Sequence, residues 1–166
     1  SGDFISKTLL MHSDDDGLTW SEPRDVTAGT KRAERVNSTA TGPGIGIVLT
    51  RGEFKGRIIM PTNEGIWDKH LRDFSVYACY SDDNGETWRY GDNAPNGDDG
   101  KGNEVQMVEL EDGSVLLNSR SIYAAKFRKQ AISTDGGATW SPLKDHHDLP
   151  EPQCMGSIIR HRWPEE

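Results

Sequence analysis

The stretch SDDDGLTW at residues 13–20 brings three consecutive aspartates next to a glycine and a tryptophan. By itself it allows three interpretations: a calcium loop, a cluster of catalytic carboxylates, or a turn. Related stretches follow at residues 81–88 (SDDNGETW) and 133–140 (STDGGATW), so the shared pattern is SxDxGxxW. The shared positions are Ser13, Asp15, Gly17, Trp20, Ser81, Asp83, Gly85, Trp88, Ser133, Asp135, Gly137 and Trp140.

The repetition favours a structural turn. An apolar run precedes each copy and a strand or a polar exit follows each tryptophan, which predicts the corner of a β-hairpin. In such a corner aspartate accepts backbone hydrogen bonds, glycine supplies positive φ and tryptophan anchors the hairpin. The triple acid itself is not repeated, because Thr134 replaces Asp14 and Asn84 replaces Asp16. No copy has a bidentate carboxylate at its far end, as a calcium loop would need, so neither a metal nor a cofactor is expected.

The spacing of the copies predicts the architecture. They start 68 and 52 residues apart, which is the scale of one four-stranded propeller blade. No stretch has a convincing 3.6-residue apolar period, so helices are expected to be short at most and the fold class is all-β. Strands are expected near residues 4–12, 44–50, 57–62, 74–81, 104–110, 114–120, 127–133 and 155–161, with shorter ones after each tryptophan.

These strands divide the chain into antiparallel blades. Residues 1–27 are expected to form the outer half of one blade, 38–92 and 102–146 two complete blades, and 155–166 the start of the next. An arc of this kind leaves blade faces open at both ends. The remaining blades, or another copy of the chain, are expected to cover them.

Composition excludes several classes of protein. A formal net charge of −8 disfavours nucleic acid and anionic membrane surfaces as partners, and the apolar runs are too short for a membrane span. The two cysteines, Cys79 and Cys154, are too few for a disulfide framework and lack metal-ligand spacing. Both are expected to be small buried side chains. The N-terminus lacks the pattern of a secretory signal, and its start within a predicted strand suggests further sequence upstream.

The segment EDG at residues 111–113 predicts a hairpin loop between two apolar runs. If the loop comprises all three residues, Glu104 falls opposite Arg120 and both side chains lie on one face. If it comprises only Asp112 and Gly113, Glu104 falls opposite Ser121 and Arg120 points to the other face. A carboxylate and a guanidinium at one end of a hairpin are either an ordinary cross-strand ion pair or the polar floor of a site.

The three SxDxGxxW copies resemble the Asp-boxes of sialidases (neuraminidases). Sortilin-like receptors and some endoglucanase propellers carry Asp-boxes too, but two more segments narrow the match: TGPGIGIVLTRGEFKGRIIMPTN at residues 41–63 and GNEVQMVELEDGSVLLNSRS at residues 102–121. They resemble the GPG…G.L…GR…P and NExQ-V-EL-DG-L-NxR segments of the sialidase fold. The resemblance implies a six-bladed β-propeller that removes terminal α-linked sialic acids from glycans, with this chain as its middle portion. It also suggests a secreted, periplasmic or cell-surface location.

The resemblance also implies roles for individual residues. NEVQ places on Glu104 the family's active-site glutamate, the partner and base of a tyrosine nucleophile, and LLNSR places on Arg120 the second member of an arginine triad. Asn63 is implied as a pocket-lining residue. The substrate's carboxylate suits an arginine fork and would repel a carboxylate nucleophile, which is why tyrosine replaces the usual second acid.

Other members of the family's site have no match in this chain. Its first arginine and acid/base aspartate belong before the first Asp-box, and its tyrosine nucleophile and third arginine belong to later blades. The 166 residues alone are therefore expected to have little or no hydrolytic activity. The tyrosines without a match as nucleophile are Tyr77, Tyr80, Tyr90 and Tyr123.

Two alternatives to a sialidase remain open. One is a non-catalytic Asp-box module that binds carbohydrate or protein, and the other is a calcium-binding β scaffold. Pairing of Glu104 with Arg120 distinguishes the sialidase from both. The basic cluster KRAER, with Lys31, Arg32 and Arg35, is expected to be a solvated loop, or else to border the mouth of the site.

Overall fold

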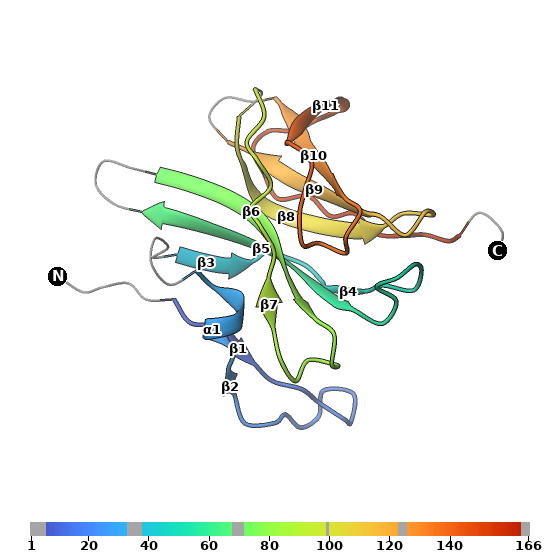
Figure 1. Cartoon of the computed structure of the whole chain (residues 1–166). Coiled ribbons are helices and arrows are strands. Elements are labelled where there is room, and N and C mark those ends of the chain that lie inside the picture. The colour runs from blue at the N-terminus through green and yellow to red at the C-terminus, as the bar shows by residue number, and fades with distance from the viewer. Residues whose placement is uncertain (1–5, 33–37, 68–71, 99, 123–125, 164–166) are drawn as a thin grey trace.

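The computed structural model describes residues 6–32, 38–67, 72–98, 100–122 and 126–163, which form three antiparallel sheets (Figure 1). The first sheet contains β1 (Leu9–Leu10) and β2 (Arg24–Asp25), followed by a single helical turn, α1 (Thr27–Thr30). The second contains β3 (Ser38–Thr41), β4 (Ile47–Val48), β5 (Ile58–Trp67), β6 (Arg72–Ser81) and β7 (Arg89–Tyr90). The third contains β8 (Gly102–Glu109), β9 (Val115–Ser121), β10 (Phe127–Ser133) and β11 (Lys144–Pro150). The all-β, antiparallel prediction is confirmed.

The second sheet is a four-stranded blade whose first strand is broken in two. Both β3 and β4 pair with β5, and the TGPGIG segment lies between them. Gly42 in this segment approaches β8 so closely that an added Cβ would lie 2.0 Å from the carbonyl oxygen of Val105. Only glycine permits that approach, which brings the second sheet against the strand that carries Glu104.

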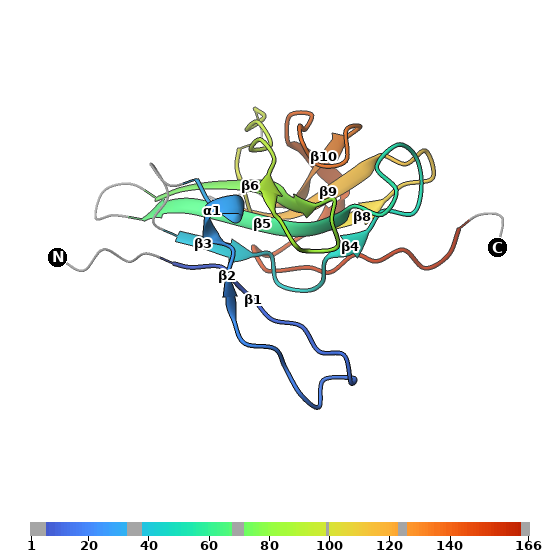
Figure 2. The same ribbon diagram turned by 60° about the horizontal axis from the view of Figure 1, so that its bottom comes forward.

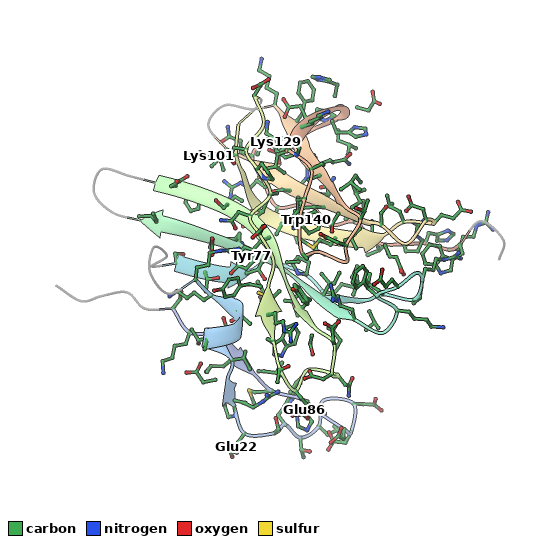
Figure 3. The ribbon with its side chains drawn as sticks, in the orientation of Figure 1. Glu22, Tyr77, Glu86, Lys101, Lys129 and Trp140 are labelled. Carbon is green, nitrogen blue, oxygen red and sulfur yellow. The ribbon has the colours of Figure 1, made fainter. Side chains whose placement is uncertain are left out.

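The hydrophobic core lies between the second and third sheets. Buried apolar residues from the facing strands form one cluster there, as expected for sheets packed face to face. Trp140 of the third Asp-box lies at this contact (Figure 3). The β1–β2 hairpin extends away from the two larger sheets (Figure 2). The buried cluster contains Leu49, Ile59, Val76, Ala78, Ala94, Val105, Met107, Val115, Leu117, Ala131, Trp140 and Leu143.

Each Asp-box is the corner of a hairpin, as its pattern predicts. In the second copy the hydroxyl of Ser81 donates to the carboxylate of Asp83 and accepts from the N–H of Gly85, both at 2.8 Å. Asp83 also accepts from the backbone N–H of Thr87 at 2.8 Å, and the indole of Trp88 donates to the Gly85 carbonyl at 3.1 Å. The bonds of serine, aspartate and glycine recur at the same lengths in the other two copies.

Arginines connect the first and second sheets to the Asp-box of the sheet that follows. Arg24, on β2, donates to the carbonyls of Gly85 and Glu86 in the second box. Arg57, just before β5, donates to the carbonyls of Asp135 at 3.2 Å and Gly136 at 3.1 Å in the third box. The corners therefore stabilise the packing between neighbouring sheets as well as their own hairpins.

Two expectations differ from the structure. Residues 155–161 form no strand, because this segment finds no antiparallel partner within the described part of the chain. Cys154 is exposed, in contrast to Cys79, which is buried as expected. Within the described ranges, no helix is long and apolar enough to cross a membrane.

The Asp83 corner makes folding sensitive to acid. Hydrogen bonds from Thr87, and then from Ser81, lower the pKa of the Asp83 carboxyl from 3.8 to about 2. A depressed folded-state pKa means that ionisation stabilises the fold above pH 3.8 and that this contribution is lost as the pH falls toward 2. Asp83→Asn is therefore expected to reduce the free energy of unfolding at pH 7 and to flatten its decline over that acid range. Urea unfolding at a series of pH values measures both effects.

The control for this experiment is Asp16→Asn. Asp16 occupies a left-handed conformation with φ of 59°, and the equivalent Asn84 has φ of 57°, so asparagine fits without strain. The Asp16 side chain makes no hydrogen bond to any described residue, and the variant should follow the wild-type pH profile. If Asp83→Asn also followed it, the role of the Asp83 carboxylate in the corner would be contradicted.

Candidate functional site

The β8–β9 hairpin has the three-residue loop. The N–H of Leu110 donates to the carbonyl of Ser114 at 2.8 Å, and Val105 pairs with Ser119 further along. Gly113 supplies the positive φ, 82°, that closes the loop. The Asp112 carboxylate accepts from the Ser114 N–H at 2.9 Å and from its hydroxyl at 2.6 Å, and these bonds lower the pKa of Asp112.

This register brings Glu104 and Arg120 together. The Arg120 Nη1 atom lies 3.2 Å from the Glu104 Oε2 atom, and each side chain is 30% exposed. The regular ladder shifts between Gly102 and Val105, so Glu104 lies in an irregular part of β8. Partly exposed ion pairs contribute little to stability. The pairing therefore matters mainly because it fixes where two chemically useful groups lie.

Ser119, on β9, holds the irregular part of β8 in place through hydrogen bonds. Its side chain is fully buried, and its hydroxyl accepts from the N–H of Asn103 at 3.0 Å. It contacts the carbonyls of Glu104 at 3.3 Å and Arg120 at 2.9 Å as a donor. A Cβ on Gly102 would lie 2.6 Å from this hydroxyl, so glycine is required there. The backbone that carries both candidate residues is thus held by one serine.

Arg120 gives Glu104 only one nitrogen of its guanidinium. Its Nε atom is buried and has no hydrogen-bond acceptor among the residues described, while Nη1 is used by Glu104. A guanidinium binds a carboxylate through two parallel N–H groups. Glu104 next to it offers a carboxylate that can accept a proton. Together they can hold an anion and activate a neighbouring hydroxyl.

Asn63 lies on β5, which packs against β8, and pairs with Ala40 and Val76. It is half-buried, and no hydrogen bond in the described structure joins its side chain to Glu104 or Arg120. Strand alternation places it on the same face as the core residue Ile59, toward the third sheet. Asn63 therefore faces the third sheet, which carries the pair, without a hydrogen bond to either residue among those described.

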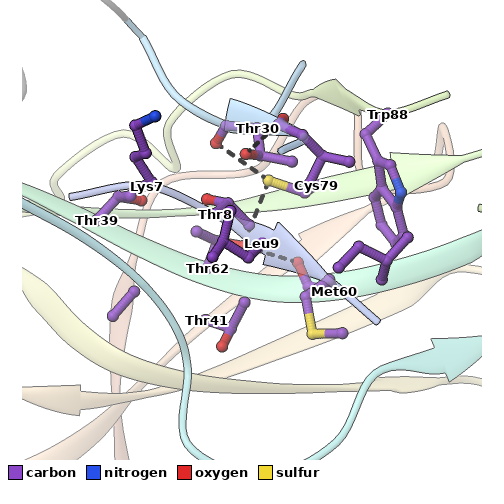
Figure 4. A pocket seen from close by; sticks show the side chains of 13 residues that line it. Lys7, Thr8, Leu9, Thr30, Thr39, Thr41, Met60, Thr62, Cys79 and Trp88 are labelled. Atoms are coloured by element: carbon purple, nitrogen blue, oxygen red, sulfur yellow. Dashed lines mark hydrogen bonds between the residues drawn. The ribbon is translucent and has the colours of Figure 1, made fainter. Parts of the chain in front are cut away.

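A separate cavity of about 320 Å³ lies between the first and second sheets (Figure 4). Its lining includes Cys79, but neither Glu104 nor Arg120. Burial raises the pKa of the Cys79 thiol to about 11, and the thiol contacts Thr62 at 3.4 Å and the Thr30 carbonyl at 3.3 Å. A protonated, enclosed thiol is a poor nucleophile, so this cavity offers no catalytic group of that kind.

Tyr77 beside the cavity is also unsuited to nucleophilic attack. Its hydroxyl donates to the carbonyl of Thr30 at 2.7 Å, and burial raises its pKa well above the ordinary value. This agrees with its lack of a match to the family's nucleophile. Tyr123, another tyrosine of the chain, lies outside the described residues.

The prediction of a solvated loop for the basic cluster is wrong for two of its residues. Lys31 is 7% exposed and donates to the carbonyl of Ser6 at 3.1 Å. Arg32 pairs with the buried Glu64 at 3.0 Å and stacks on the rings of Tyr77 at 4.7 Å and Tyr90 at 4.8 Å. Arg35 lies outside the described residues. Lys31 therefore connects the end of α1 to the segment before β1, and Arg32 connects it to the second sheet.

Sequence reasoning also misses the residues that support the pair. Ser119 lies within LLNSR but has no role implied there, Arg128 and Glu151 belong to no motif, and each of the three acts through partners on another element. Only Ser119 has a detectable signal. Once the hairpin register is fixed, counting along β8 and β9 places it opposite Val105.

Comparison with known proteins identifies relatives of this chain. The family model of the BNR repeat-like domain matches residues 2–159. A sialidase of Micromonospora viridifaciens is 40% identical over 89% of this chain and 22% of its own length. A sialidase of Paraclostridium sordellii is 32% identical over 91% of this chain and 37% of its own. The chain thus spans well under half of each relative.

A solved structure shows the same fold. The intramolecular trans-sialidase of Ruminococcus gnavus, in complex with oseltamivir carboxylate, matches with a TM-score of 0.72 and 31% identity. The match covers 88% of this chain and 28% of that protein. The two larger sheets are accordingly blades of a sialidase-type propeller.

Ser119→Ala tests whether the serine supports the site. It leaves the buried N–H of Asn103 without its acceptor, so the free energy of unfolding should fall by about 1–3 kcal/mol. Urea unfolding measures the change. The exposed Ser157 provides a control, since Ser157→Ala should stay within about 0.5 kcal/mol of wild type. Equal stability of the two variants would contradict the role of Ser119 in supporting the site.

Proposed function

The chain belongs to the family of BNR repeat-like domains, and we propose that it forms part of the catalytic propeller of an exo-α-sialidase. The substrate would be a glycan that ends in sialic acid. The observation that carries the proposal is the pairing of Glu104 with Arg120 at 3.2 Å on one hairpin. Similarity to sialidases over 89% and 91% of the chain supports it.

Each member of the pair has a distinct role in this proposal. Arg120 holds the substrate carboxylate through the part of its guanidinium that Glu104 does not use. Glu104 accepts the proton of a tyrosine hydroxyl as that tyrosine attacks the anomeric carbon, which bears the carboxylate. The bond from this carbon to the glycosidic oxygen breaks, and the leaving oxygen takes a proton from the acid/base aspartate of another blade. A neutral nucleophile avoids the repulsion that a second carboxylate would meet there. The Glu104–Arg120 pair also keeps both groups oriented before substrate binds.

The remaining catalytic groups would come from outside these residues. The acid/base aspartate, the tyrosine and two arginines belong to blades that the 166 residues do not contain, and those blades would also cover the open faces of the arc. We expect the 166 residues alone to give little or no turnover for this reason. Asn63, on the side of β5 that faces the third sheet, would line the pocket beside the pair.

Glu104→Gln in the full-length protein tests the assignment. Glutamine keeps the shape of the side chain but cannot accept the tyrosine proton, so kcat on a fluorogenic sialoside should fall by about 10²- to 10⁴-fold. The control is Glu111→Gln, which neutralises an exposed carboxylate in the loop of the same hairpin and should leave kcat unchanged. Unchanged turnover of Glu104→Gln would remove the assigned role. A wild-type protein that binds sialosides without hydrolysing them would instead favour the non-catalytic module.

A further inference from the structure

A row of four charged residues crosses the third sheet at the candidate site. Glu104 and Arg120 form an ion pair on β8 and β9. On the next strand, Lys129 pairs with Ser119, so the same register puts Arg128 beside Arg120. Glu151 follows β11 and forms an ion pair with Arg128. The charges across the row are negative, positive, positive and negative.

Arg128 lies on the same face as Arg120. Its Nε atom donates to the side-chain oxygen of Asn118 at 2.7 Å, and Asn118 precedes Arg120 by two residues on β9, which places both on one face. The Arg128 side chain is 8% exposed. Its Nη1 atom also donates to the carbonyl of Cys154 at 3.0 Å. These bonds hold the guanidinium in one position.

Glu151 binds both Arg128 and the backbone next to Arg120. Its side chain is 4% exposed, with Oε2 lying 3.3 Å from the Arg128 Nη1 atom. Its other oxygen, Oε1, accepts from the backbone N–H of Ser121 at 3.0 Å and from the Ser121 hydroxyl. Since Ser121 follows Arg120 directly, one buried carboxylate fixes the end of β9.

The two guanidinium groups and the two carboxylates of this row balance in charge. Like charges side by side on neighbouring strands repel, and here each guanidinium has its own carboxylate. Burial lowers the pKa of the Arg128 guanidinium, while the negative charges of Glu151 and, less strongly, Glu104 act in the opposite direction. Without the charge of Glu151, Arg128 would be attracted to Glu104 and would compete with Arg120 for it.

We propose that Arg128 and Glu151 are a positioning pair that keeps the guanidinium of Arg120 directed at the substrate carboxylate. Glu151 does so by binding Arg128, which leaves Glu104 to Arg120, and by fixing the backbone at Ser121. The inference rests on the proposed function, because it assumes that Arg120 binds the carboxylate of sialic acid. Neither residue touches the substrate.

Glu151→Gln in the full-length protein tests this pair. Glutamine keeps the volume and an acceptor for Ser121 but removes the charge. The KM for a fluorogenic sialoside, and the Ki of an unsaturated sialic acid analogue that retains the carboxylate, should both rise about tenfold, since binding depends on a correctly held guanidinium. The carboxamide form of the same analogue should bind as in wild type. Glu151→Asp keeps the charge on a shorter side chain and should restore most of the affinity.

Glu109→Gln is the matched control. Glu109 is also a buried carboxylate, 6% exposed, and it accepts N–H groups of Thr50 at 2.9 Å and Arg51 at 2.8 Å at the opposite end of β8. Its loss should lower thermal stability without changing KM or either Ki. This separates a loss of folded protein from a loss of substrate positioning.

The outcomes distinguish the two proposals. Selective loss of carboxylate affinity in Glu151→Gln, restored by Glu151→Asp, supports the positioning pair. A similar loss of stability in Glu151→Gln and Glu109→Gln, with KM and Ki unchanged in both, overturns it while the sialidase assignment stands. If Glu151→Gln does not fold, Glu151→Asp decides: a partial rise in Ki for the carboxylate analogue alone supports the pair, and no change or equal weakening for both ligands overturns it. If Arg120→Ala retains the preference for carboxylate over carboxamide, the role of Arg120 fails, and the positioning pair fails with it.

Discussion

The register of the β8–β9 hairpin is the constraint on which the candidate site depends. The loop of residues 111–113, closed by the bond from Leu110 to Ser114 at 2.8 Å, sets Glu104 opposite Arg120. A slip of one residue would direct Arg120 to the other face of the sheet. Asp112 and Gly113 lie in the loop, at the other end of the hairpin from Glu104 and Arg120. The loop nevertheless determines whether these two residues are paired. Local turn chemistry therefore determines the chemistry at the other end of the strands.

The most acidic stretch of the chain has a structural role. In each Asp-box the carboxylate of the shared aspartate accepts hydrogen bonds from the serine hydroxyl and from a backbone N–H group. Arg24 and Arg57 donate to backbone carbonyls of the following box. The corners thus hold neighbouring sheets together. The candidate chemistry lies instead at the opposite ends of the strands, where Glu104 and Arg120 are partly open to solvent.

Much of this could be predicted because the signals are local. The Asp-box corners, the hairpin loop and the Glu104–Arg120 spacing each depend on residues close in sequence. The burial of Lys31 and Arg32 cannot be predicted locally, because their partners, including Glu64 on β5, are distant. The same holds for Arg128 and Glu151, whose guanidinium and carboxylate meet only after β10 and β11 are in place. Residues 155–161 form no strand since strand formation requires a neighbour that the described chain does not supply.

A crystal structure of the full-length protein with a bound sialic acid analogue would test the central claim most directly. The account predicts that the ligand carboxylate lies within hydrogen-bonding distance of the Arg120 guanidinium, with Glu104 next to a tyrosine hydroxyl that faces the anomeric carbon. The Glu104–Arg120 pair should be retained on binding. A ligand whose carboxylate is bound elsewhere, with Arg120 not in contact with it, would contradict the account.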